Sequence, residues 1–142
     1  MRTTTRRSSG GLALIVLVGA LAVAGCQASD SLAGPTWQWT GSTAIADVAS
    51  NPADYTIQFR TDGTVAVRAD CNTLSGTYAV SIPLGLTITL APASMAACPG
   101  DSLDGPYVEL LRKVEAYSTG GGALSLELAD DGGMLQFQPA GS

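Results

Sequence analysis

The chain has 142 residues, 46% of them hydrophobic, and carries twelve acidic against seven basic side chains. This length suffices for one domain with its own core, and the excess of acid excludes the basic surface that nucleic-acid binding requires. The sequence contains no histidine, which excludes Ser-His-Asp and Cys-His catalysis and most zinc sites.

The N-terminal segment has the parts of a secretory signal peptide. Arg2, Arg6 and Arg7 form a basic start without acids, and residues 11–24 form an uncharged, mostly apolar run. A membrane-spanning helix needs roughly 20 apolar residues, and the polar stretch from Gln27 ends this run too early. Residues 1–25 are therefore predicted to be a signal peptide.

A lipidation motif ends this signal. Val23-Ala24-Gly25-Cys26 resembles the bacterial lipobox, in which an aliphatic residue and two small residues precede a cysteine. The resemblance implies cleavage before Cys26 and lipid on its thiol, with palmitate-type acyl chains that hold the protein on the extracytoplasmic face of the cell membrane. The alternative is an ordinary signal or an uncleaved anchor in which Cys26 plays no part. From Cys26 onward the net charge is −8, so membrane attachment would depend on lipid.

Two further cysteines, Cys71 and Cys98, form an even set in an oxidising compartment, which favours a disulfide between them. The bond would close a loop of 28 residues, and the loss of chain entropy in the unfolded state would stabilise the fold by about 3.6 kcal/mol. The alternative is a pair of buried thiols that pack as small hydrophobic groups on neighbouring strands.

Along the chain, residues 26–35 are small and polar and predict a lipidated tether, so that the folded domain covers 36–139. Strands are expected where polar and apolar side chains alternate: 36–40, 55–60, 65–69, 76–80, 84–90, 124–128 and 135–137. Turns are expected at Asp62-Gly63, between Cys71 and Gly76, and at Asp130-Asp131-Gly132-Gly133.

The period changes after residue 104. Five side chains recur at helical spacing and predict one amphipathic helix: Tyr107, Leu110, Leu111, Val114 and Tyr117. Pro106 and Asp104 suit its first turn, and Gly120-Gly121-Gly122 is expected to end it. The predicted fold class is α+β and mainly antiparallel β, a small rolled-up sheet of six or seven strands with the helix over an open face or end.

The order of several motifs resembles the META domain, found in HslJ-like bacterial envelope proteins. Asp70-Cys71-Asn72 is followed by Ser75-Gly76-Thr77-Tyr78, with Trp37 before them and Ala97-Cys98-Pro99 after them. The resemblance covers about residues 33–139. It implies a barrel-like META fold with one helix, in exported or lipid-anchored proteins of which several are linked to stress, motility or drug tolerance. It implies no catalytic residue and no cofactor.

The remaining candidates have a structural and a functional interpretation. Asp130-Asp131-Gly132-Gly133 lacks the ligand spacing of a calcium loop and predicts a hairpin turn, and Asp101 and Asp104 are expected to serve the helix start. The polar cluster 68–72 is either a recognition patch or an Asx-type turn in which Asn72 bonds nearby backbone, and the turn is favoured.

Trp37 and Trp39 lie on one face of a predicted strand. They are either an exposed binding face or part of the core, and the core is favoured.

These observations predict a lipid-anchored, non-enzymatic binding or structural module at the cell envelope, with the membrane through Cys26 and an envelope protein as partners. No cofactor, no metal site and no nucleic-acid partner are expected. One alternative is a protein inhibitor of an envelope-attacking hydrolase, with a protruding loop from Ala91 to Pro99 fixed by the disulfide. Another is an enzyme using carboxylates alone, which needs two acids about 5–10 Å apart in a cleft.

Overall fold

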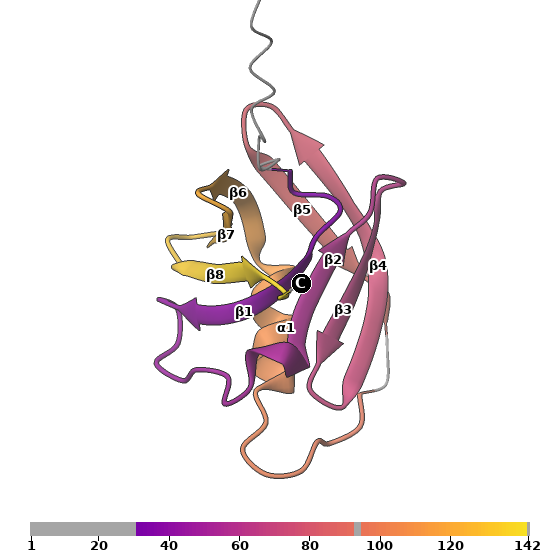
Figure 1. Cartoon of the computed structure of the whole chain (residues 1–142), viewed down its shortest axis with the longest axis vertical. Coiled ribbons are helices and arrows are strands. Elements are labelled where there is room, and N and C mark those ends of the chain that lie inside the picture. Colours follow the sequence, from indigo (N-terminus) through magenta and orange to yellow (C-terminus); the bar gives the residue numbers. More distant parts are fainter. Residues whose placement is uncertain (1–30, 93–94, 142) are drawn as a thin grey trace, which may run out of the picture.

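The computed structural model describes residues 31–92 and 95–141, in which eight antiparallel strands close into a barrel (Figure 1). The elements are β1 (Thr36–Ser42), the short 3-10 helix η1 (Pro52–Asp54), β2 (Tyr55–Phe59), β3 (Thr64–Ala69), β4 (Asn72–Ser81), β5 (Gly85–Leu90), α1 (Asp104–Arg112), β6 (Val114–Gly120), β7 (Ala123–Leu128) and β8 (Met134–Pro139). Each strand pairs with the next along the chain, and β8 pairs with β1. The predicted fold class is confirmed, with one strand more than expected.

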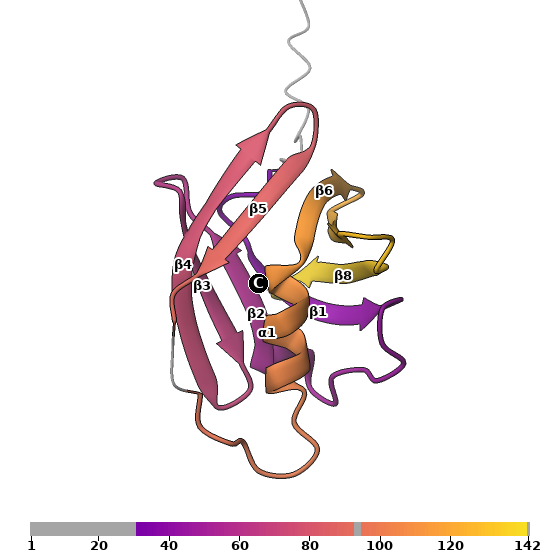
Figure 2. The same ribbon diagram turned by 180° about the vertical axis from the view of Figure 1, so that it is seen from behind.

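The helix fills a gap in the barrel wall. β5 and β6 are paired only at Gly85 and Ala116, and α1 lies where these two strands diverge (Figure 2). Tyr107 and Leu111 of the helix are fully buried, so α1 covers the core where the gap between β5 and β6 would otherwise leave it open.

Strand direction divides the connections between two ends of the barrel. Because neighbouring strands are antiparallel, the start of the described chain lies at the same end as the β2–β3, β4–β5 and β6–β7 turns; we call this the N-terminal end. The opposite end, called the helix end, has the β1–β2 connection (43–54), the β3–β4 turn (70–71), the loop 91–103 and the β7–β8 turn (129–133).

Both tryptophans belong to the core. Trp37 and Trp39 are only 3% and 1% exposed, which confirms the favoured interpretation and excludes an exposed tryptophan face. The Trp39 ring stacks on Tyr107 of α1 at 5.0 Å and meets Tyr55 edge-on at 5.8 Å. These aromatic contacts join β1, β2 and the helix inside the barrel.

The predicted helix is too long at its carboxyl end. It ends at Arg112, and Val114 and Tyr117 belong to β6. A bulge in β6 shifts the register between Val114 and Ala116, so residues three apart face the same side and imitate helical spacing. The glycines expected to end the helix instead form the β6–β7 turn, where Gly121 and Gly122 have positive φ.

The turn expected between Cys71 and Gly76 is also wrong. The chain turns at Asp70, which has a φ of 55°, and β4 then runs without interruption from Asn72 to Ser81. Gly76 lies inside this strand and does not end it. Glycine is needed there because a Cβ would collide with the Thr89 carbonyl oxygen of β5. The turns predicted at Asp62-Gly63 and at 130–133 are confirmed.

The first residues of the described chain are already part of the domain. Leu32 is buried, Ala33 forms a bridge with Phe59, and the Gly34 N–H donates to the Phe59 carbonyl. The expected tether, 26–35, is therefore wrong at its carboxyl end. The predicted signal 1–25 and Cys26 lie outside the described residues. Within the part of the chain that the structure describes, no helix is long and apolar enough to cross a membrane.

Candidate functional site

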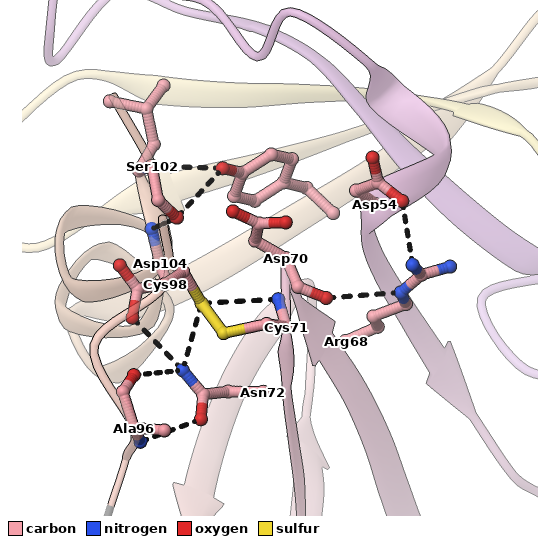
Figure 3. Close-up of a disulfide and its surroundings, with 11 residues drawn as sticks. Asp54, Arg68, Asp70, Cys71, Asn72, Ala96, Cys98, Ser102 and Asp104 are labelled. Carbon is pink, nitrogen blue, oxygen red and sulfur yellow. Dashed lines mark hydrogen bonds and ion pairs between the residues drawn. A yellow bond between two sulfur atoms is a disulfide. The ribbon is translucent and has the colours of Figure 1, made fainter. Parts of the chain in front are cut away.

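A disulfide joins the β3–β4 turn to the loop 91–103 at the helix end (Figure 3). Cys71 follows directly on Asp70, and Cys98 lies in the loop. The pairing expected from the sequence is present, and the alternative of two buried free thiols is not. The bond gives the loop a covalent attachment to the sheet.

Asn72 supplies a second attachment for the same loop. Its side-chain Nδ2 donates to the Ala96 carbonyl at 2.8 Å and to the Asp104 carboxylate at 3.1 Å, and its Oδ1 accepts from the Ala96 N–H at 3.0 Å. Because Ala96 is 24 residues further along the chain, the predicted local Asx turn is wrong. Asn72 is 9% exposed and joins the strand, the loop and the helix start inside the fold.

Tyr55 positions the beginning of α1. Its hydroxyl accepts a hydrogen bond from the Leu103 N–H at 2.9 Å and lies 3.3 Å from Ser102 Oγ. Ser102 Oγ in turn accepts from the Asp104 N–H at 3.2 Å. Backbone N–H groups at a helix start have no partner within the helix, so Tyr55 and Ser102 satisfy two of these groups and fix where the loop meets the helix.

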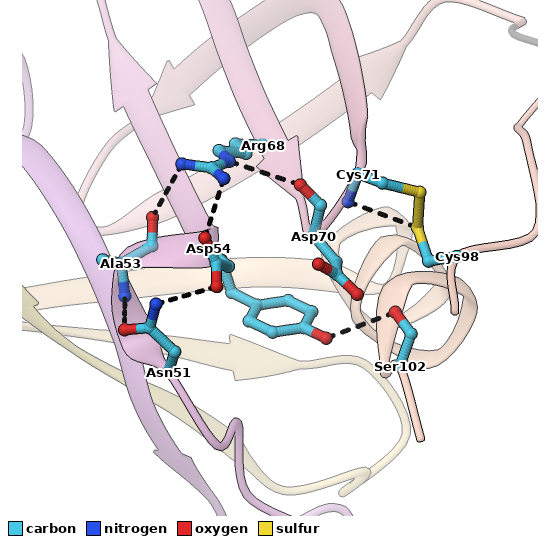
Figure 4. A network of polar contacts seen from close by, with 9 residues as sticks. Asn51, Ala53, Asp54, Arg68, Asp70, Cys71, Cys98 and Ser102 are labelled. Carbon is cyan, nitrogen blue, oxygen red and sulfur yellow. Dashed lines mark hydrogen bonds and ion pairs between the residues drawn. A yellow bond between two sulfur atoms is a disulfide. The ribbon is translucent and has the colours of Figure 1, made fainter. Parts of the chain in front are cut away.

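Arg68 connects the β1–β2 connection to the β3–β4 turn (Figure 4). Its guanidinium lies 2.7 Å from the Asp54 carboxylate and also donates to the carbonyls of Asp70 and Ala53. Asn51 donates to the other carboxylate oxygen of Asp54 at 2.8 Å. The ion pair is partly exposed, with 50% of the Arg68 side chain accessible, so it adds little stability and chiefly holds the two connections next to each other.

A cleft of about 660 Å³ opens between the β1–β2 connection, the β3–β4 turn and the loop 91–103. It is lined by Asp47, Val48, Ser50, Asp54, Tyr55, Asp70, Pro99, Asp101, Ser102 and Leu103. The volume is in the usual range for ligand sites, but the lining is polar and includes no basic side chain.

Four carboxylates dominate the electrostatics of this cleft. Asp54 is paired with Arg68, whereas Asp47, Asp70 and Asp101 have no ion-pair partner among residues 31–92 and 95–141. The cleft therefore presents a net negative charge. In that same part of the chain, no group of three or more acidic, histidine or cysteine side chains is placed to hold a metal ion.

The acids singled out from the sequence separate in the structure. Asp101 lines the cleft, Asp104 begins α1, and Asp130 and Asp131 form the β7–β8 turn with positive φ. No local sequence pattern groups Asp47, Asp54 and Asp70 as a site, because their connections are far apart in the chain. The available signal was topological: in a meander, alternate connections share one end.

Comparison with known proteins gives a family and a fold. The model of the META domain matches residues 30–142. A DUF4847 family protein from Bacteroides vulgatus has a TM-score of 0.59 and 16% identity, covering 75% of this chain and 93% of its own. A Burkholderia xenovorans protein solved by NMR has a TM-score of 0.60 and 22% identity, covering 78% and 85%. No curated protein matches. At these identities the two structures show a shared fold alone.

Proposed function

This chain belongs to the META domain family, and we propose that it is a lipid-anchored, non-enzymatic module that binds a positively charged partner at the cell envelope. The observation that carries the proposal is the acid-lined cleft at the helix end. The anchor rests on the signal peptide and on the lipobox at Cys26. The link of several META proteins to stress suggests that envelope stress is the condition in which the module acts.

The chemistry of the cleft favours a cationic group. Asp47, Asp70 and Asp101 bring carboxylates from three separate connections to one opening, and clustered charge of one sign attracts and orients the opposite charge. A basic peptide segment of an envelope protein fits this requirement. Histidine and thiol catalysis are not proposed because the sequence has no histidine and both cysteines of the domain are in the disulfide. An enzyme that uses carboxylates alone stays an alternative, since the cleft brings four carboxylates together.

The cleft can be tested with a triple variant of its lining and a double variant as control. In the first, Asp47→Asn, Asp70→Asn and Asp101→Asn remove charge from the lining. In the control, Asp130→Asn and Asp131→Asn remove charge from the same end but outside the cleft. Asparagine tolerates the positive φ of Asp70, Asp130 and Asp131, so the turns are preserved.

The binding of a lysine-rich peptide to the processed protein, from residue 26 onward, is measured by calorimetry. Cross-linking in cells then uses the same variants. We expect the cleft variant to weaken peptide binding about tenfold, which corresponds to about 1.4 kcal/mol, and to lose an envelope partner that the control keeps. Equal binding by both variants would show that the cleft is not the site. Mass analysis of the processed N-terminus tests lipid on Cys26 separately.

A second function, inhibition of an envelope-attacking hydrolase, is favoured by the state of the loop 91–103. Residues 95–103 of this loop project at the helix end in both views (Figures 1 and 2) and are held by the disulfide and by Asn72. A loop already fixed in conformation loses little entropy on binding. The test is inhibition of a panel of cell-wall hydrolases by the wild-type protein and by a variant with residues 95–97 replaced by Gly-Ser-Gly. Absence of inhibition, or equal inhibition by both proteins, would contradict this function.

A further inference from the structure

The tip of the β4–β5 hairpin gathers exposed apolar side chains. Val80, Ile82 and Leu84 are 50%, 98% and 49% exposed. Among the described residues only one other large apolar side chain is exposed, Val48 at 63%, and it lies at the helix end. Exposed apolar side chains scattered singly need no explanation, but three at one turn form a surface that water solvates poorly.

The β4–β5 hairpin extends beyond the end of its neighbour β3. β3 pairs with β4 only as far as Thr77, while β4 and β5 remain paired up to Ser81 and Gly85. On the other side, β6 contacts the start of β5, where Gly85 pairs with Ala116 and the Leu84 carbonyl accepts from the Tyr117 N–H at 3.0 Å. At the N-terminal end the turn extends beyond β3, and the hairpin stands out from the barrel in both ribbon views (Figures 1 and 2).

This projecting segment carries no charge. From Cys71 to Gly100 the sequence contains no Asp, Glu, Lys or Arg, although the chain from Cys26 onward has a net charge of −8. A charged side chain would have to be desolvated before the tip entered an apolar medium, and that penalty is large. The β4–β5 hairpin has no charged side chain, so this desolvation cost does not arise. The acids of the cleft are at the other end of the barrel.

The tip lies at the end where the chain enters the domain. Ala33 bridges to Phe59, and the Phe59 ring packs against Tyr78 of β4 at 5.0 Å, so the first described residues lie beside the base of the hairpin. Cys26 is five positions before Ser31. Five residues extend at most about 18 Å, so lipid on Cys26 would keep the N-terminal end close to the membrane.

We propose that the β4–β5 tip, formed by Val80, Ile82 and Leu84, enters the lipid of the membrane as a second, non-covalent contact. The inference rests on the lipid anchor of the proposed function. Because the lipid anchor already holds the protein on the membrane, the tip is at high local concentration there, and even a weak second contact becomes effective. The turn lies at the depth of the lipid headgroups, where its free backbone groups remain hydrated. The barrel is then oriented with the cleft facing away from the membrane.

The test compares two labelled positions at opposite ends of the processed, lipidated protein. Ile82→Cys and the control Val48→Cys are each labelled with an environment-sensitive fluorophore and reconstituted into vesicles of phosphatidylcholine and phosphatidylglycerol. Both positions are well exposed, so neither substitution disturbs the core. We expect spin-labelled lipid to quench the Ile82→Cys label and aqueous iodide to leave it bright, with the reverse at Val48→Cys.

A third variant tests the contact by adding charge. Leu84→Asp in the Ile82→Cys background is expected to abolish lipid quenching while the protein stays on the vesicle through its acyl chains. Iodide quenching of both labels would overturn the inference, and so would an Ile82→Cys label shielded from iodide and lipid alike, because that tip would contact another protein copy. Absence of acyl chains on Cys26 in mass analysis would instead contradict the anchor of the proposed function.

Discussion

The two ends of the barrel differ in length of connection and in charge. Turns at the N-terminal end are short and include the uncharged β4–β5 tip, whereas the helix end has the connections 43–54 and 91–103. Six aspartates lie in helix-end connections: Asp47, Asp54, Asp70, Asp101, Asp130 and Asp131. The strands need only an alternation of buried and exposed side chains to form the barrel, so each end is free to acquire its own chemistry.

The largest expected effect is at the helix end, where the disulfide holds the loop. In the double variant Cys71→Ser, Cys98→Ser, the unfolded chain recovers the freedom of a 28-residue loop, and the free energy of unfolding is expected to fall by about 3.6 kcal/mol. Urea denaturation of the processed protein measures this loss, and wild-type protein under reducing conditions is the control. A loss below about 1 kcal/mol would contradict the view that the bond supports this end.

A smaller effect is expected from the second attachment of the loop. Asn72→Ala removes both hydrogen bonds to Ala96 and the bond to Asp104, and the free energy of unfolding should fall by about 1–2 kcal/mol. Thr73→Ala, an exposed neighbour on β4, is the control and should change little. Hydrogen exchange of the Ala96 N–H should accelerate in Asn72→Ala while exchange in the β4–β5 strands stays unchanged. Acceleration at both ends would show that the ends are coupled.

Two buried tyrosines of one aromatic cluster offer a finer comparison. The Tyr55 hydroxyl accepts from the Leu103 N–H, whereas the Tyr107 hydroxyl is buried without a hydrogen-bond partner among the described residues. Burial raises the pKa of Tyr107 well above its usual value, so this hydroxyl stays neutral. Tyr55→Phe should destabilise by about 1 kcal/mol, and Tyr107→Phe should leave stability unchanged or raise it by up to about 1 kcal/mol. Calorimetric melting of both variants measures the difference, and equal losses would contradict it.

The sequence predicted those parts of the fold that depend on local pattern. Alternation located seven strands, and Asp62-Gly63 and Asp130-Asp131 located two turns. β6 was missed because a bulge after Val114 makes a strand look helical. The long-range role of Asn72 could not be predicted, because no sequence pattern indicates a hydrogen-bond partner 24 residues away. The cleft was missed for the same reason: its acids come from connections that only barrel closure brings together.

The smallest expected effect belongs to the N-terminal end and is a matter of pH. Hydrogen bonds from the Thr64 hydroxyl and N–H, at 2.6 and 2.9 Å, hold the pKa of Asp62 below its ordinary value of 3.8. Because the folded pKa is lowered, the stabilisation is present above the unfolded pKa and is lost as pH falls through the folded one. Titration of the Asp62 carboxylate by NMR should give a midpoint below 3.8, and Thr64→Ala should move that midpoint upward. The midpoint should be the same in the Cys71→Ser, Cys98→Ser variant, because the Asp62 turn and the disulfide lie at opposite ends. A shift there would mean that the helix end determines the conformation of the N-terminal end, and the two could no longer be treated as separate surfaces.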